Sequence, residues 1–184
     1  SAERGSDPAY SLDDYYAFID GRPRVDGVRT LLASRGISLP EGAPDDPADA
    51  PTVWGLGNRK NDEFSSVLEN EGVEPYPGSV SFLDAAIAAG LEVAVVTSSR
   101  NGLRVLDVAG LSDRFEVVVD GILAADRGLP GKPAPDTYVL GAQLLGLEPQ
   151  DCAIVEDAIS GVSAGRRGGF GLVIGLDRGV SAEA

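Results

Sequence analysis

The sequence predicts an α/β protein: a parallel sheet with helices on both faces, preceded by a small helical domain. Two observations lead to this class. Short valine-rich segments alternate with helical segments from residue 80 onward, whereas residues 10–74 show helical periodicity without a strand pattern. Strands that alternate with helices form parallel sheets through right-handed crossovers, so the second part predicts a doubly covered, Rossmann-like core.

The strands of this core are expected at four apolar segments, and each is followed by a helical one. We predict strands at 92–96, 115–119, 152–155 and 170–174, and helices at 80–89, 101–109, 135–145 and 159–167. Glycines directly after three of these helices are typical of helix C-termini. Continuous apolar strands of this kind are buried on both faces of a parallel sheet.

The first part reads as helices and loops. Ser11 is a good N-cap for a helix over 12–19, and Asp14 completes a weak capping box. Further helices are expected around 28–36 and over 52–68, separated by a proline-rich loop. The segment Glu74-Pro75-Tyr76-Pro77-Gly78 interrupts the helical pattern, and we place the domain boundary there. It divides the chain into a helical domain 1–74 and a core 75–184.

Composition excludes several classes of function. The chain has no histidine and one cysteine, Cys152, so Ser–His triads, most zinc sites and intrachain disulfides are excluded. A net charge of −14 disfavours nucleic acid and anionic membranes as partners. No apolar run is long enough for a bilayer span, and we expect a cytoplasmic protein. The oligomeric state stays open, and the arginine-rich, alanine-rich composition suggests a bacterial source.

Hydroxyl side chains follow the first predicted strand. Thr97 and Ser98 stand between this strand and the helix that begins near Asn101. Hydroxyls and free backbone N–H groups at such a position suit a phosphate group. Taken alone, the simpler interpretation is that one of them caps the next helix.

Lys132 is one of only two lysines, and it lies in the segment Gly131-Lys132-Pro133-Ala134-Pro135-Asp136. Two prolines stiffen this loop, so it can hold an ammonium group in place without further loss of entropy. Such a cation can neutralise a phosphoryl group in its transition state. The alternative is a solvated surface lysine.

Two adjacent carboxylates, Glu156 and Asp157, follow the third predicted strand. At the end of a buried strand they would be poorly solvated, and Mg²⁺, which takes one or two carboxylates, would relieve this. A solvated pair at the start of the next helix is equally compatible with the pattern. Ligands bind parallel sheets beyond the carboxyl ends of the strands, so hydroxyls, lysine and carboxylates are expected at one edge.

Together these segments resemble a known family. Residues 95–101 (VVTSSRN), 131–136 (GKPAPD) and 155–161 (VEDAISG) are similar to the second, third and fourth motifs of haloacid dehalogenase-type phosphotransferases. Residues 22–27 (RPRVDG) and 58–62 (NRKND) resemble the helical cap of the beta-phosphoglucomutase-like subgroup. The resemblance covers nearly the whole chain.

The resemblance implies a role for each matched residue. Thr97, with the Ser98 backbone, binds the transferring phosphoryl group, and Lys132 balances its charge. Asp157 ligates Mg²⁺, and Glu156 ligates it or supports its surroundings. Residues expected to bind the substrate and its phosphates are Thr97, Ser98, Asn101, Arg24 and Lys60. Without the resemblance, Arg24 and Lys60 would be expected to pair with nearby acids such as Asp26 or Asp62.

One departure from the family pattern is large. The family's first motif is a strand followed by Asp-Xaa-Asp, where the first aspartate is the nucleophile, yet no two aspartates here stand two positions apart. We therefore expect the central first strand of the sheet to be missing. The chain also lacks methionine, which predicts a reading frame that begins upstream.

Three hypotheses follow. The chain is a portion of a Mg²⁺-dependent phosphotransferase that acts on a phosphorylated sugar through aspartyl phosphate, as a beta-phosphoglucomutase or sugar phosphatase, with beta-glucose 1-phosphate as first candidate; alone it is inactive. Alternatively, it is a non-catalytic relative that binds a phosphorylated ligand or a protein partner. The third is a generic parallel-sheet binding domain unrelated to phosphate.

Overall fold

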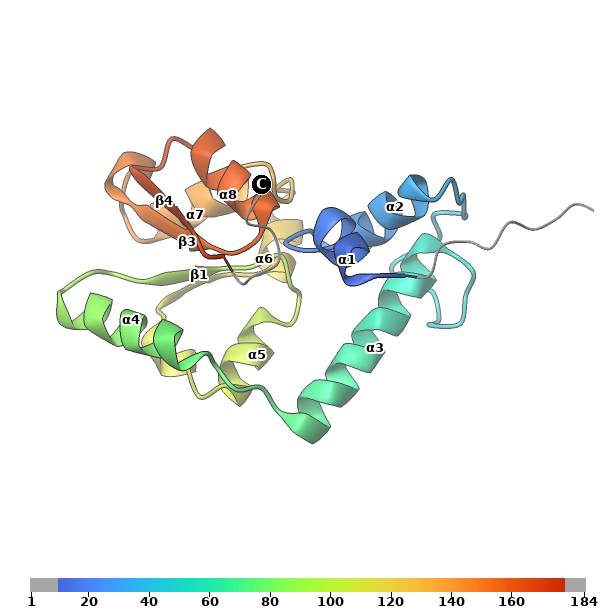
Figure 1. The fold of residues 1–184 in the computed structure, drawn as a ribbon, viewed down its shortest axis with the longest axis horizontal. Helices are drawn as coiled ribbons and strands as arrows, with labels where there is room; N and C mark the ends of the chain where they lie inside the picture. The colour runs from blue at the N-terminus through green and yellow to red at the C-terminus, as the bar shows by residue number, and fades with distance from the viewer. Residues whose placement is uncertain (1–9, 178–184) are drawn as a thin grey trace, which may run out of the picture.

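The computed structural model describes residues 10–177, and the first part of this range is helical. Helices α1 (Leu12–Phe18), α2 (Arg24–Ser34) and α3 (Val53–Glu71) pack together, with α2 against both others. Figure 1 shows them side by side, away from the strands. The predicted boundary at residues 74/75 falls in the loop between α3 and the next helix, α4 (Pro77–Ala88).

Local capping explains where the first helices begin. The Ser11 side chain accepts a hydrogen bond from the Asp14 backbone, and the Asp14 side chain accepts one from the Ser11 backbone, so the predicted capping box is confirmed. Thr52 caps α3 in the same way, through a bond from the Gly55 backbone.

The core follows the predicted alternation of strand and helix. Its elements are β1 (Ala94–Val96), α5 (Gly102–Val108), a 3₁₀ turn (Ser112–Arg114), β2 (Val117–Val119), α6 (Gly121–Asp126), α7 (Asp136–Leu144), a second 3₁₀ turn (Pro149–Asp151), β3 (Ala153–Glu156), α8 (Ile159–Arg167) and β4 (Leu172–Gly175). Strands β1, β2 and β4 are one or two residues shorter than predicted, whereas β3 has the predicted length and is shifted by one residue. Helix α6 was not predicted; Asp120 caps it by accepting from two backbone N–H groups.

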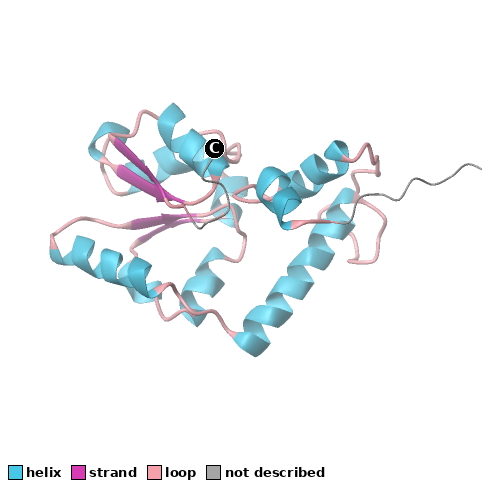
Figure 2. Ribbon diagram, viewed as in Figure 1, coloured by secondary structure: helices cyan, strands magenta, loops and turns pink. Residues whose placement is uncertain are grey.

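The strands form two separate parallel pairs, shown in magenta in Figure 2. In one, β1 pairs with β2 in the register Val95–Val118; in the other, β3 pairs with β4 in the register Val155–Ile174. Within the described residues no ladder joins β1 to β3. A break at this point agrees with the expectation that a central strand is missing.

Helices lie on both sides of the strands, as predicted. Helix α7 packs on β1 and β2, and α8 packs on β3 and β4. In Figure 1, α4 and α5 lie below β1, whereas α7 and α8 lie above it. The side chain of Val119 in β2 is fully buried, and Ala164 of α8 is buried under its strands. No helix within residues 10–177 is long and apolar enough to cross a membrane.

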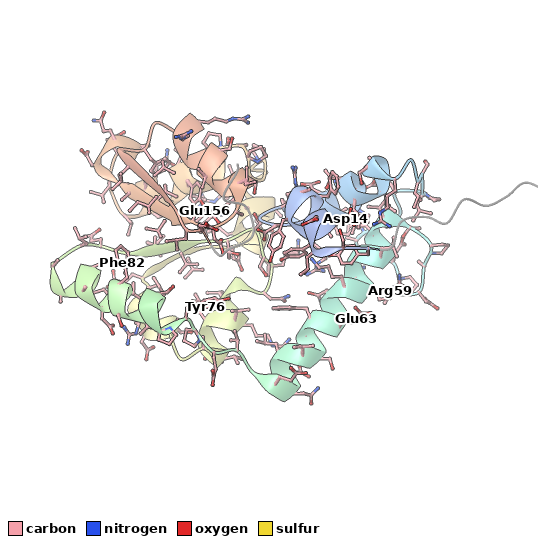
Figure 3. All side chains as sticks on the ribbon, in the orientation of Figure 1. Asp14, Arg59, Glu63, Tyr76, Phe82 and Glu156 are labelled. Atoms are coloured by element: carbon pink, nitrogen blue, oxygen red, sulfur yellow. The ribbon has the colours of Figure 1, made fainter. Side chains whose placement is uncertain are left out.

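Helix α4 is apolar but poorly covered. None of its residues is buried. Phe82 within it and Tyr76 just before it are 58% and 63% exposed, and Figure 3 labels Phe82 at the left of the molecule and Tyr76 nearer its middle. Val155 of β3 is also 42% exposed. Exposed apolar side chains beside two unjoined strand pairs are what a sheet without its middle strand would leave.

Candidate active site

A cavity of about 870 Å³ lies between the strand ends and the helical part. All eight residues that the sequence indicated line it: Arg24, Lys60, Thr97, Ser98, Asn101, Lys132, Glu156 and Asp157. They come from α2, α3, the loop after β1, the end of β3 with the residue that follows it, and the loop before α7. The structure thus brings together in one cavity residues that are far apart in the sequence; Arg24 and Asp157 are separated by 133 positions.

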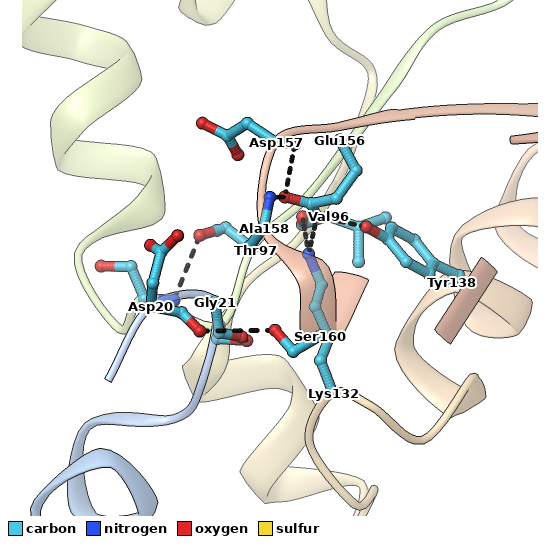
Figure 4. Close-up of polar contacts among 12 residues, drawn as sticks. Asp20, Gly21, Val96, Thr97, Lys132, Tyr138, Glu156, Asp157, Ala158 and Ser160 are labelled. Atoms are coloured by element: carbon cyan, nitrogen blue, oxygen red, sulfur yellow. Dashed lines mark hydrogen bonds and ion pairs between the residues drawn. The ribbon is translucent and has the colours of Figure 1, made fainter. Parts of the chain in front are cut away.

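Lys132 is the most buried cation of this cavity, with 6% of its surface exposed. Its Nζ donates to Glu156 Oε2 at 2.6 Å and to the Val96 carbonyl oxygen at 3.4 Å (Figure 4). The bond to Val96 links the loop before α7 to the end of β1. The interpretation of Lys132 as a solvated surface lysine is therefore wrong.

Glu156 ends β3 with both carboxylate oxygens occupied. Oε1 accepts from the Asp157 and Ala158 backbone N–H groups, and Oε2 accepts from Lys132 Nζ and from the Tyr138 hydroxyl. Burial alone would raise the pKa of Glu156, but the Lys132 ammonium and these hydrogen bonds outweigh it and lower the pKa to about 2. Glu156 is therefore a carboxylate at neutral pH.

Asp157 differs from its neighbour in being exposed at the cavity. Its oxygen atoms fit a Mg²⁺ ion, which prefers oxygen ligands and keeps several waters. Within residues 10–177, no three histidine, cysteine or acidic side chains gather as a ready metal cage. The donor set therefore suits a metal held by one or two carboxylates and completed by water or substrate oxygens.

The loop after β1 is folded back on itself. Thr97 Oγ1 accepts from the Ser99 N–H at 3.1 Å, and the Ser98 hydroxyl donates to the Gly21 carbonyl oxygen at 2.9 Å. Asn101 is the N-cap of α5, without a side-chain capping bond. The interpretation that Thr97 or Ser98 caps this helix is therefore wrong.

Asn61 of α3 joins the helical part to the core. Its Oδ1 accepts from Arg24 Nη2 at 2.5 Å and from Asn101 Nδ2 at 2.9 Å. Arg24 and Lys60 form no ion pair among the described residues, so the expectation that they pair with Asp26 or Asp62 is wrong. Sequence reasoning included Asn61 in a motif but assigned it no role, because its contacts span 37 and 40 positions.

Cationic groups concentrate where α2 and α3 face the loop after β1. Burial and the nearby Arg100 lower the pKa of the Arg24 guanidinium, and Asp62 opposes this. Burial and Arg24 likewise lower the pKa of the Lys60 ammonium, with Asp20 opposing. Mutual repulsion among Arg24, Arg100 and Lys60 makes this side suited to an anion. Arg100 was not singled out from the sequence, although its place beside Asn101 was a usable signal.

The model of the haloacid dehalogenase-like hydrolase family matches residues 3–169. The chain belongs to this family. The three segments that resemble the second, third and fourth motifs of this family each contribute lining residues to the cavity: Thr97, Lys132 and the Glu156–Asp157 pair. A generic parallel-sheet domain unrelated to the family is thereby ruled out.

Relatives of this haloacid dehalogenase-like hydrolase include enzymes named for sugar phosphates. The beta-phosphoglucomutase of Mycobacterium bovis is 48% identical over 187 residues, which cover 100% of this chain and 71% of the relative. Hexitol phosphatase A of Escherichia coli is 32% identical over 159 residues, covering 85% of this chain and 64% of the relative.

The fold agrees with a solved structure of the same family type. Beta-phosphoglucomutase from Clostridium difficile superposes with a TM-score of 0.72 at 20% identity, covering 90% of this chain and 69% of that chain. At this identity the likeness concerns the fold alone. It supports the α/β architecture that the strand and helix alternation predicted.

Proposed function

We propose that the cavity is the phosphate- and metal-binding part of a Mg²⁺-dependent phosphotransferase that acts on a phosphorylated sugar. The observation that carries this proposal is the buried Lys132 ammonium, which reaches the same cavity as Thr97, Asp157 and the cationic Arg24. An ammonium held there neutralises a transferring phosphoryl group without reorganising at the moment of reaction.

The two sides of the cavity suit two ends of one substrate. On the core side, Thr97 and the Ser98 N–H bind the transferring phosphoryl group and Lys132 balances its charge. On the side that faces the helical part, Arg24 of α2 and Arg100 of the loop after β1 bind a distal phosphate, while Lys60 and Asn101 contact the sugar. The beta-phosphoglucomutase and hexitol phosphatase names of the relatives support a phosphorylated sugar as the ligand.

Asp157 is the metal ligand in this proposal, and Glu156 holds Lys132 and stays beside the metal. When bound, Mg²⁺ offsets the negative charge of the phosphoryl oxygens. The helical segment 1–74 acts as a cap over the core 75–184, and the cavity between them excludes water from the reacting group. A cytoplasmic location suits an enzyme of phosphorylated sugars.

Transfer through aspartyl phosphate needs a nucleophilic carboxylate after a strand. No two aspartates in the sequence are two positions apart, so these 184 residues do not hold the Asp-Xaa-Asp pattern. We therefore propose that the 184-residue chain alone turns over no substrate, and that the nucleophile reaches the cavity on a strand between β1 and β3. The second candidate, a non-catalytic relative that binds a phosphorylated ligand, is favoured by the same missing pattern.

One experiment separates the two. The 184-residue chain and the product of the uninterrupted reading frame that contains it are purified and incubated with Mg²⁺ and beta-glucose 1-phosphate or hexitol phosphates. We expect phosphoenzyme and turnover only with the longer product, and loss of both in Lys132→Met. Sugar phosphate binding without phosphoenzyme in the longer product would favour the non-catalytic relative.

A further inference from the structure

Tyr138 is the one aromatic side chain that touches both members of the Lys132–Glu156 pair in the described part of the chain. It lies in α7 and is 5% exposed. Its hydroxyl donates to Glu156 Oε2 at 2.5 Å, and the Lys132 ammonium lies 4.6 Å from the centre of its ring. Figure 4 shows the three side chains converging from separate segments.

We propose that Tyr138 is a positioning residue, which fixes the Lys132 ammonium at the cavity by its ring face and by sharing the Glu156 oxygen. The inference deepens the proposed function and rests on it for the catalytic consequence, but not for the placement of Lys132. Tyr138 itself does not line the cavity, so it acts through Lys132 rather than on the substrate.

Tyr138 acts on the Lys132–Glu156 pair through two contacts, one from its ring and one from its hydroxyl. The ring face attracts the ammonium and keeps it against α7, since cations are drawn to aromatic faces within about 6 Å. The hydroxyl takes up part of the negative charge of Glu156 Oε2. Without that bond, Glu156 Oε2 would have Lys132 as its single side-chain donor, and the Lys132–Glu156 pair would no longer be anchored to α7 through the hydroxyl.

The ring has a second neighbour that holds it in place. Phe170 meets Tyr138 edge to face, with ring centres 5.9 Å apart. Because this contact involves the ring and not the hydroxyl, Tyr138→Phe keeps both ring contacts and removes only the hydrogen bond to Glu156. This substitution therefore isolates the proposed role with little effect on packing.

The sequence offers a sharp spectroscopic readout, since it contains only two lysines, Lys60 and Lys132. The 184-residue chain is labelled with ¹⁵N-lysine, and Lys132→Arg assigns the two side-chain ammonium signals. In the parent chain, the buried Lys132 ammonium should exchange its hydrogens slowly, and Lys60, which is more exposed than Lys132, serves as internal reference. In Tyr138→Phe the Glu156 carboxylate loses one hydrogen bond and holds the Lys132 ammonium less firmly, so we expect the exchange at Lys132 to rise at least about tenfold, as one lost hydrogen bond to a charged group gives.

The matched control is Tyr10→Phe, the same change at a tyrosine that is 54% exposed, which should leave both signals unchanged. Circular dichroism checks that each variant keeps its fold. Tyr138→Leu, which also removes the ring, should release Lys132 further; exchange at Lys132 in Tyr138→Phe within twofold of the parent overturns the proposal.

An activity arm uses the longer product that transfers phosphate. There Tyr138→Phe should lower kcat about tenfold and leave KM within twofold, because Tyr138 does not contact the substrate. Equal losses in kcat and binding would indicate a merely structural role and overturn the proposal. If the parent transfers no phosphate while the Lys132 signal still responds to Tyr138→Phe, the proposed function fails and the placement of Lys132 by Tyr138 stands.

Discussion

Lys132 Nζ lies 2.6 Å from Glu156 Oε2, and both side chains are almost removed from solvent, with 5% and 11% of the side chain exposed. The pair joins the loop before α7 to the end of β3, and the bond from Lys132 to Val96 extends it to β1. A lysine and a glutamate 24 positions apart therefore connect the two strand pairs at the cavity.

Removing the cation of this pair should destabilise the protein strongly. Lys132→Met leaves the buried Glu156 charge without its partner, and such losses amount to about 3–5 kcal/mol. The double variant Lys132→Met/Glu156→Gln should recover part of this loss. Urea unfolding of the two single variants and the double variant measures the coupling; purely additive effects would contradict an interaction between the two side chains.

The space beside Glu156 depends on Gly161 in α8. A Cβ added at Gly161 would lie 2.2 Å from Glu156 Oε2, so Gly161→Ala must displace the carboxylate that holds Lys132. We expect a loss of about 1–3 kcal/mol, as overpacking gives, and lower activity in the longer product. The control is Gly78→Ala in α4, where nothing lies within 4 Å of the added Cβ and thermal stability should be kept. Equal melting temperatures for both variants would count against the close approach.

Lowering the pH should decrease the stability of the metal-free protein, because Glu156 becomes protonated. Its folded-state pKa of about 2 lies below the ordinary value of 4.5, so ionised Glu156 stabilises the fold above pH 4.5. This contribution is lost as the pH falls from about 4.5 towards 2. The stability difference between the parent and Glu156→Gln, measured by urea unfolding, should therefore shrink across this window. A difference that stays constant from pH 5 to pH 3 would show that the pKa of Glu156 is not lowered.

The cationic side of the cavity should determine substrate affinity. Arg24→Gln and Arg100→Gln in the longer product are each expected to raise KM for a sugar phosphate about tenfold or more, since each removes a charge-assisted contact with the distal phosphate. Arg166→Gln, at an exposed position of α8, serves as the matched control. Steady-state kinetics at two ionic strengths tests this, and KM values that match the control would exclude a distal phosphate at this place.

The Asp157 carboxylate should contribute strongly to the affinity of the protein for Mg²⁺. Asp157→Asn is expected to weaken Mg²⁺ binding by about tenfold or more, because it removes the charge of the exposed carboxylate. Asp126→Asn, an equally exposed aspartate at the end of α6, should bind Mg²⁺ like the parent. Calorimetric titration with MgCl₂ measures both. Undiminished binding in Asp157→Asn would move the metal site elsewhere.

The local signals of the sequence were sufficient for most elements. The Ser11–Asp14 capping box and the helix 159–167 lie where the sequence placed them, and the observed strand 94–96 lies within the predicted 92–96. Helix α6 was missed because six residues carry too little periodicity to stand out from a loop. Its capping residue, Asp120, was the signal that was available.

The sequence by itself determined the alternation of strands and helices and the set of polar residues at the strand ends, because capping, periodicity and strand-end position are local properties of the chain. Only the tertiary structure decided that Lys132 is buried, that Tyr138 and Lys132 share one oxygen of Glu156, and that Asn61 joins Arg24 to Asn101. These contacts link residues 18 to 40 positions apart, and their geometry depends on how α3, α7 and β3 pack rather than on any short stretch of sequence.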